Sequence, residues 1–93
     1  MIDGNPNEFI DKAYTGQDII FIYHGIKYWF QGYTKNNGIC HMEIFQYQPS
    51  SDDYIWEHND VSMEKCLDEF IKAPIFDGKT FWDVEQEIQW VDD

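Results

Sequence analysis

The hydrophobic pattern of this 93-residue chain begins with a short helix. Asn5 stands at a helix-cap position, Pro6 at the first helical position and Glu8 at the third, which together form a capping-box pattern. The apolar residues that follow recur with helical spacing and fall on one side: Phe9, Ile10, Ala13 and Tyr14. Because glycine readily adopts the left-handed conformation, we expect this helix to end at Gly16.

Three strands joined by two tight turns are predicted next. Residues 18–23 and 26–34 are rich in isoleucine and aromatic residues and flank His24-Gly25, a typical two-residue hairpin loop. The second turn, residues 35–38, is compatible with a loop of two or of three residues. A change of one residue would send every side chain of the next strand to the opposite side of the sheet.

We choose the three-residue loop, residues 36–38, because it alone keeps one side of the sheet apolar. This side, face A, then carries Phe21, Phe30, Cys40, Met42 and Ile44. The other side, face B, carries a mixture of apolar and polar residues: Ile20, Ile22, Lys27, Trp29, Gln31, Tyr33, His41, Glu43 and Phe45. We therefore expect the helices to pack on face A.

The second half of the chain predicts one strand and two helices. Residues 54–58 form a short fourth strand. A helix begins near Ser62 and stops before Pro74, with a regular apolar stripe: Met63, Cys66, Leu67, Phe70 and Ile71. Thr80 is expected to cap a last helix, whose inward side would be Phe81, Val84, Ile88 and Val91, flanked by Trp82 and Trp90.

These elements predict a single α+β domain over residues 1–93. Its sheet would be an antiparallel four-stranded meander with helices packed on one face, in the order α-β-β-β-β-α-α.

Charge narrows the classes of partner. The chain has no arginine and a net charge of −12, and residues 52–93 hold thirteen carboxylates against three lysines. Such a field repels phosphate backbones and anionic lipids and attracts cationic surfaces. We therefore expect no nucleic-acid partner and no membrane partner, and we expect a basic protein partner instead.

The two cysteines and the first residues of the chain indicate where in the cell the protein is expected. Cys40 and Cys66 occupy apolar positions, as buried free thiols do. The first residues lack the apolar segment of a signal peptide, and no apolar run reaches the length of a membrane span. The sequence thus predicts a cytoplasmic protein.

Candidate chemistry is sparse. His41, Glu43 and His58 would meet on face B if the fourth strand paired beside the third, which would place potential acid-base or metal-binding groups together. Cys40 and His41 are neighbours in a strand and point to opposite faces. Cys66 lies in the helical apolar stripe, where burial suppresses thiol reactivity. We expect no catalytic residue, no metal site and no cofactor.

Face B offers a candidate interaction surface instead. Trp29, Tyr33, Phe45 and Trp56 would form an aromatic patch there, either exposed for a partner or covered by a terminal helix. His41 and two carboxylates of the acidic half complete the predicted partner-binding set. Its members are Trp29, Tyr33, His41, Phe45, Trp56, Asp83 and Glu87.

Three segments carry a resemblance to other proteins: Phe9 and Ile10, the hairpin of residues 23–28, and residues 73–82. In these segments the chain resembles a group of small acidic proteins of Gram-positive bacteria with no assigned function. The shared motifs are a hairpin, a helix stop and a helix cap, so the resemblance implies no activity and no site.

The sequence therefore favours a non-enzymatic, acidic protein-binding module, such as an immunity-like or antitoxin-like inhibitor of a basic partner. A homodimer formed through face B is one alternative. A small-molecule binding protein or enzyme that uses His41, Glu43 or His58 is another.

Overall fold

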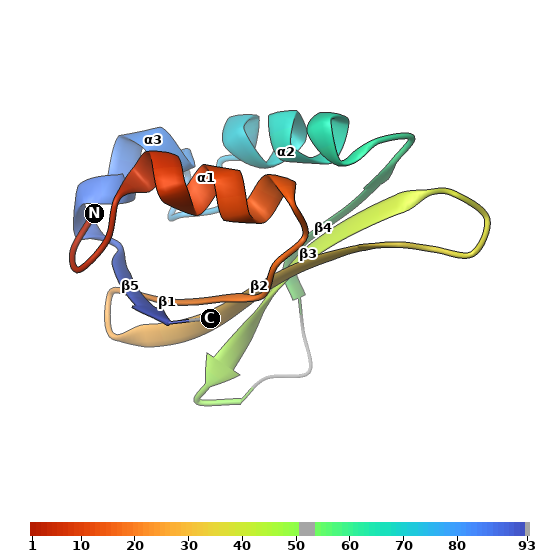
Figure 1. Cartoon of the computed structure of the whole chain (residues 1–93). Coiled ribbons are helices and arrows are strands. Elements are labelled where there is room, and N and C mark those ends of the chain that lie inside the picture. Colours follow the sequence, from red (N-terminus) through yellow and green to blue (C-terminus); the bar gives the residue numbers. More distant parts are fainter. Residues whose placement is uncertain (51–53, 93) are drawn as a thin grey trace.

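The computed structural model describes residues 1–50 and 54–92 and contains a five-stranded antiparallel sheet in the order β4-β3-β2-β1-β5. The strands are β1 (Ile19–Tyr23), β2 (Ile26–Thr34), β3 (Cys40–Gln48), β4 (Tyr54–Asp60) and β5 (Gln89–Asp92). The helices are α1 (Pro6–Tyr14), α2 (Met63–Lys72) and α3 (Phe81–Val84), with a 3-10 turn, η1 (Glu85–Glu87), after α3. All of the helices lie on one side of the sheet (Figure 1). The α+β class and the meander of β1 to β4 are as predicted.

Both hairpins have the predicted loops. His24 and Gly25 have positive φ angles, 51° and 80°, as a two-residue hairpin loop requires, and Tyr23 pairs with Ile26. In the second hairpin, Lys35 N–H donates to the Ile39 carbonyl oxygen at 2.8 Å, which encloses a three-residue loop. Its register places Phe30 opposite Ile44, so face A stays apolar.

The first two helices begin where the sequence predicts, at Asn5 and near Ser62. The Asn5 side chain accepts a 2.8 Å hydrogen bond from the Asn7 N–H, and the Ser62 hydroxyl accepts one of 3.2 Å from the Lys65 N–H. These bonds satisfy backbone donors that a helix leaves free at its start. Each helix then turns its apolar stripe toward face A.

Aromatic rings fill the space between the helices and face A. The Phe9 ring of α1 lies 5.1 Å from the ring of Phe81 and 6.0 Å from that of Phe30. The Phe70 ring of α2 lies 4.8 Å from Phe30. These four rings are completely buried. They join α1, α2, α3 and β2 in one core.

The last predicted helix is wrong beyond residue 84. Only Phe81–Val84 is α-helical, and Gln89–Asp92 forms β5, which pairs with β1 through Phe21 and Trp90. Trp90 is therefore buried (9% exposed), whereas Val91, expected inside, is 42% exposed. The open edge of β1 offers backbone hydrogen-bond partners to this segment, and Trp90 and Val91 have strong β propensity. This strand is additional to the predicted order and gives the sheet five strands instead of four.

In the described residues, no helix is both long enough and apolar enough to cross a bilayer.

Candidate functional site

Face B is the open side of the sheet. No helix or strand in the described part of the chain lies over it, because the helices occupy face A (Figure 1). The pairing of β2, β3 and β4 arranges its residues in three rows. One row is Tyr33, His41 and Asn59, the next is Gln31, Glu43 and Glu57, and the third is Trp29, Phe45 and Tyr54. A polar middle row thus lies between two rows that contain aromatic rings.

An aromatic cluster occupies one end of face B and consists of Trp29, Phe45, Tyr47 and Tyr54. Trp29 stacks on Phe45 with ring centroids 5.6 Å apart, and Tyr47 meets Trp29 edge-on at 5.5 Å. Tyr54 contacts Phe45 at 5.8 Å. Of these rings, Tyr47 and Tyr54 are 40% and 50% exposed. Contiguous apolar surface of this kind is typical of interaction sites.

The indole N–H of Trp29 is buried and has no hydrogen-bond acceptor in the described residues. Burying a donor without a partner costs about 1–3 kcal/mol, so native structures rarely contain one. The aromatic cluster therefore includes a polar group that the described chain leaves unsatisfied.

A buried polar network lies beside the aromatic cluster. His41 and Glu43 are only 5% and 4% exposed although no helix covers them. The His41 Nε2 atom lies 2.6 Å from Glu43 Oε1, and the Gln31 amide donates to Glu43 Oε2 at 2.8 Å. On the other side of the imidazole, Nδ1 lies 2.8 Å from the Asn59 side-chain oxygen. Buried charged groups need such partners to be tolerated.

Both ring nitrogens of His41 are engaged in this network. A protonated imidazole donates from Nε2 to Glu43 and from Nδ1 to the Asn59 oxygen. A neutral imidazole keeps the bond to Glu43 if the Asn59 amide turns so that its nitrogen donates to Nδ1. Neither state leaves a nitrogen of His41 free to bind a metal or to accept a substrate proton.

Negative charge accumulates in the middle row. Glu43 and Glu57 face each other directly on β3 and β4, an arrangement that is unfavourable for two like charges. The charge of Glu43 is the main reason why the pKa of the Tyr54 hydroxyl is raised above its ordinary value, with burial and a hydrogen bond to Glu43 as further causes. Face B thus combines exposed aromatic rings with an anionic centre.

The predicted placement of the aromatic patch on face B is confirmed in part. Trp29, Tyr33 and Phe45 lie on face B, and Tyr33 is 47% exposed with its ring 5.1 Å from that of His41. His41 also lies on face B, but its side chain is buried by its neighbours.

The predicted placement of Trp56 in this patch is wrong. Trp56 pairs with Ile44 on face A and packs 5.7 Å from the Phe70 ring. The register between β3 and β4 shifts between Ile44 and Phe45, and this irregularity sends Tyr54 to face B in its place.

The two predicted acidic contacts lie elsewhere. Asp83 accepts hydrogen bonds from the Thr80 N–H and hydroxyl at the start of α3. Glu87 lies 2.9 Å from Nε2 of His24, at the turn between β1 and β2. Figure 1 places α3 on the helix side of the sheet, so Asp83 does not share a surface with the aromatic cluster.

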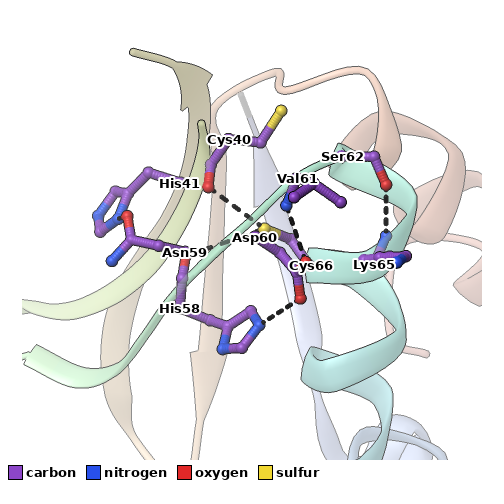
Figure 2. Close-up of polar contacts among 9 residues, drawn as sticks. All are labelled: Cys40, His41, His58, Asn59, Asp60, Val61, Ser62, Lys65 and Cys66. Atoms are coloured by element: carbon purple, nitrogen blue, oxygen red, sulfur yellow. Dashed lines mark hydrogen bonds and ion pairs between the residues drawn. The ribbon is translucent and has the colours of Figure 1, made fainter. Parts of the chain in front are cut away.

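His58 does not join His41 and Glu43. It pairs with Met42, so its side chain leaves the sheet on the opposite side, where Nε2 lies 3.0 Å from Asp60 Oδ2. Figure 2 shows the His41 and His58 rings on opposite sides of β4. Within the described residues, no group of three histidine, cysteine or acidic side chains could hold a metal ion.

The two cysteines are buried free thiols, as predicted. The Cys66 thiol donates to the Cys40 carbonyl oxygen at 3.6 Å, and burial raises the pKa of this thiol above its ordinary value (Figure 2). A protonated, buried thiol is a poor nucleophile.

Sequence reasoning missed four members of this site, namely Tyr47, Tyr54, Glu57 and Asn59. Alternation along β3 would have placed Tyr47 beside Phe45 on face B. The positions of Tyr54 and Asn59 depend on how β4 pairs with β3, which no local pattern fixes.

No family model matches this chain, and no curated protein or solved structure matches it. The resemblance to small acidic proteins of Gram-positive bacteria therefore remains a prediction.

Proposed function

We propose that this protein is a non-enzymatic binding module that uses face B to dock on a basic protein. The observation that carries the proposal is the aromatic cluster, with Tyr47 and Tyr54 exposed, on a sheet face that no described helix or strand covers. Aromatic residues are enriched at the centres of protein interfaces, where they contribute large contact areas.

The charge of the chain supports a basic partner. Net charge is −12, and face B itself carries Glu43 and Glu57 against the single lysine Lys27. Complementary charge accelerates the encounter of two proteins and selects against partners of the same sign. An inhibitor of the immunity or antitoxin kind, which covers a cationic site on its target, fits these properties.

The polar groups of face B support a binding role over catalysis. The His41 ring is held on both nitrogens, and His58 and Cys66 lie on the other side of the sheet. We place the interaction in the cytoplasm because both thiols are free, as expected in a reducing compartment.

Self-association through face B is the second candidate, since the same aromatic rings could meet a second copy across a two-fold axis. Two chains of charge −12 repel each other, which favours a basic partner over a homodimer. Sedimentation at micromolar concentration separates the two, because a dimer that Trp29→Ala dissociates would support self-association and contradict the basic partner.

The decisive experiment is affinity purification from the native host, followed by direct binding measurements with the purified basic protein. We expect Trp29→Ala to weaken binding by roughly tenfold or more, as the loss of an interface hot spot does. Trp82→Ala is the control, because Trp82 is an exposed tryptophan that lies on α3, away from face B. Association should slow as salt increases.

Equal binding by wild type and Trp29→Ala would contradict the proposal, as would an association rate that is indifferent to ionic strength.

A further inference from the structure

We propose that the outer edge of β4 is a docking site for an extended, cationic segment of another protein, which pairs with β4 as an additional strand. The site consists of the free backbone edge of β4 and the side chain of Glu57 in the middle of that strand. It does not require Trp29, on which the proposed function depends, so the two can be tested separately. Three observations support it, namely an open edge, exposed apolar side chains at both ends of that edge and a central carboxylate.

The two edges of the sheet differ in what lies beyond them. At the β5 edge, Ile2 forms a parallel bridge with Gln89, and the Ile2 N–H donates to the Ile88 carbonyl oxygen at 2.8 Å. The first residues of the chain therefore occupy part of that edge. In residues 1–50 and 54–92, no backbone hydrogen bond joins β4 to any strand except β3. Because alternate residues of a strand direct their N–H and C=O groups to each side, an added strand finds donors and acceptors along β4.

The edge of β4 is regular over residues 56–60, which pair one for one with residues 40–44. Exposed apolar side chains lie at both ends of this stretch. Tyr54 is 50% exposed, and Val61, which directly follows β4, is 64% exposed. A segment that pairs with β4 covers these side chains with its own, so backbone hydrogen bonds and apolar contacts act together, as they do where a peptide extends a sheet.

The charge of β4 selects a cationic segment. Glu57 is exposed in the middle of the strand, and β4 contains no lysine. A second copy paired antiparallel over the whole of β4 would place the two Glu57 side chains directly opposite each other, which is unfavourable. Two chains of net charge −12 also repel each other. A lysine or arginine opposite Glu57 reverses both effects, so the edge disfavours a second copy and favours a basic strand.

The test uses the full chain and a synthetic peptide as the probe. The peptide has seven residues, the length of β4, and alternates valine and threonine on either side of a central lysine. We expect saturable NMR shifts at the amides of Glu57, His58 and Asn59, and slower hydrogen exchange along β4. The same peptide with a central glutamate should bind roughly tenfold more weakly, because like charges then face each other across the new pair.

Two N-methylated peptides test whether the peptide backbone makes the contact. Each carries methyl groups on alternate backbone nitrogens, and together the two peptides block both edges of the probe. A peptide that adds to a sheet as a strand uses only one of its edges. We therefore expect one methylated peptide to lose binding and the other to keep it. Equal affinities of the two methylated peptides would contradict strand addition.

Two variants with the same change in net charge test the role of Glu57. Glu57→Lys should reduce the preference for the lysine peptide over the glutamate peptide to roughly twofold or less. Glu69→Lys makes the same change at an exposed position of α2, and the roughly tenfold preference should remain. Equal preferences in the two variants would show that net charge selects the peptide and would overturn the inference.

Trp29→Ala separates this inference from the proposed function. Peptide binding should be unchanged in this variant, because Trp29 lies on β2, two strands away from the edge. Loss of peptide binding would place the contact on the aromatic cluster and refute the edge site. A basic protein that depends on Trp29, together with no localised peptide shift on β4 at millimolar concentration, would leave the proposed function standing and refute this inference alone.

Discussion

At the scale of single residues, the buried pair of His41 and Glu43 is the most unusual feature of the molecule. Both side chains lie on the side of the sheet opposite the described helices, yet both are almost inaccessible to water. Tyr33 packs on the His41 ring, and Gln31 and Asn59 complete the hydrogen bonds of the pair. A buried hydrogen-bonded network of this kind is stable only while every member keeps its partner.

We therefore predict that His41→Ala is much more damaging than Glu43→Gln. Loss of His41 leaves a buried carboxylate with one donor fewer, and we expect the free energy of unfolding to fall by about 2–4 kcal/mol. Glu43→Gln removes the charge but keeps an oxygen that accepts from His41, so a loss of about 1 kcal/mol is expected. Urea unfolding followed by tryptophan fluorescence measures both. Equal losses in the two variants would contradict this prediction.

At the scale of elements, the C-terminal segment is divided between a short helix and a strand. The four residues of α3 depend on their cap, in which Asp83 accepts from both the N–H and the hydroxyl of Thr80. The strand that follows closes the β1 edge of the sheet. On its far side, the Trp90 N–H donates to the Ile2 carbonyl oxygen at 2.9 Å. This contact ties the start of the chain to its end.

The cap of α3 predicts a specific dependence on pH. Hydrogen bonds from the Thr80 N–H and hydroxyl lower the pKa of Asp83 below its ordinary value. The resulting stability is present above the unfolded pKa of about 3.9 and is lost as pH falls through the lower folded value. Between about pH 5 and pH 2, wild type should therefore lose more stability than Asp83→Asn.

Thr80→Val is the matched variant for this measurement. It removes the hydroxyl bond and keeps the N–H bond, so its loss of stability with acid should lie between those of wild type and Asp83→Asn. Urea unfolding at a series of pH values gives the three slopes. Parallel slopes for wild type and Asp83→Asn would contradict the role of the cap.

At the scale of the whole molecule, the net charge of −12 acts against folding as well as in favour of a basic partner. Like charges repel more strongly in the folded protein than in the expanded unfolded chain. The aromatic core between face A and the helices offsets this repulsion. Binding of a basic protein would both neutralise the charge and cover the aromatic cluster.

Screening should therefore stabilise the free protein. Between about 0.02 M and 0.5 M NaCl, we expect the stability to rise by about 1 kcal/mol, which corresponds to an increase in Tm of about 4–8 °C. Glu69→Lys, at an exposed position of α2, makes the net charge less negative and should show a smaller increase. Thermal unfolding followed by circular dichroism measures Tm. A Tm that falls with salt would show that attractive ion pairs outweigh the general repulsion.

The sequence by itself determined the parts of the fold that depend on local geometry. The positive φ angle of Gly38 and the apolar alternation of β2 and β3 specify a three-residue loop and one register. The caps at Asn5 and Ser62 set the starts of two helices. Each of these features is decided by residues a few positions apart, so a local pattern is enough to predict it. These local features were enough to assign face A and face B and to place Trp29, Tyr33 and Phe45 on face B.

Only the tertiary structure decided the features that depend on distant partners. Gln89–Asp92 became a strand because the edge of β1 was free to pair, and the irregular register beside Phe45 put Tyr54 on face B in place of Trp56. The burial of His41 arises in the same way, because Tyr33 and Asn59 come from two other strands. Backbone hydrogen bonds between strands are indifferent to side-chain identity, so their partners emerge only when the whole sheet assembles.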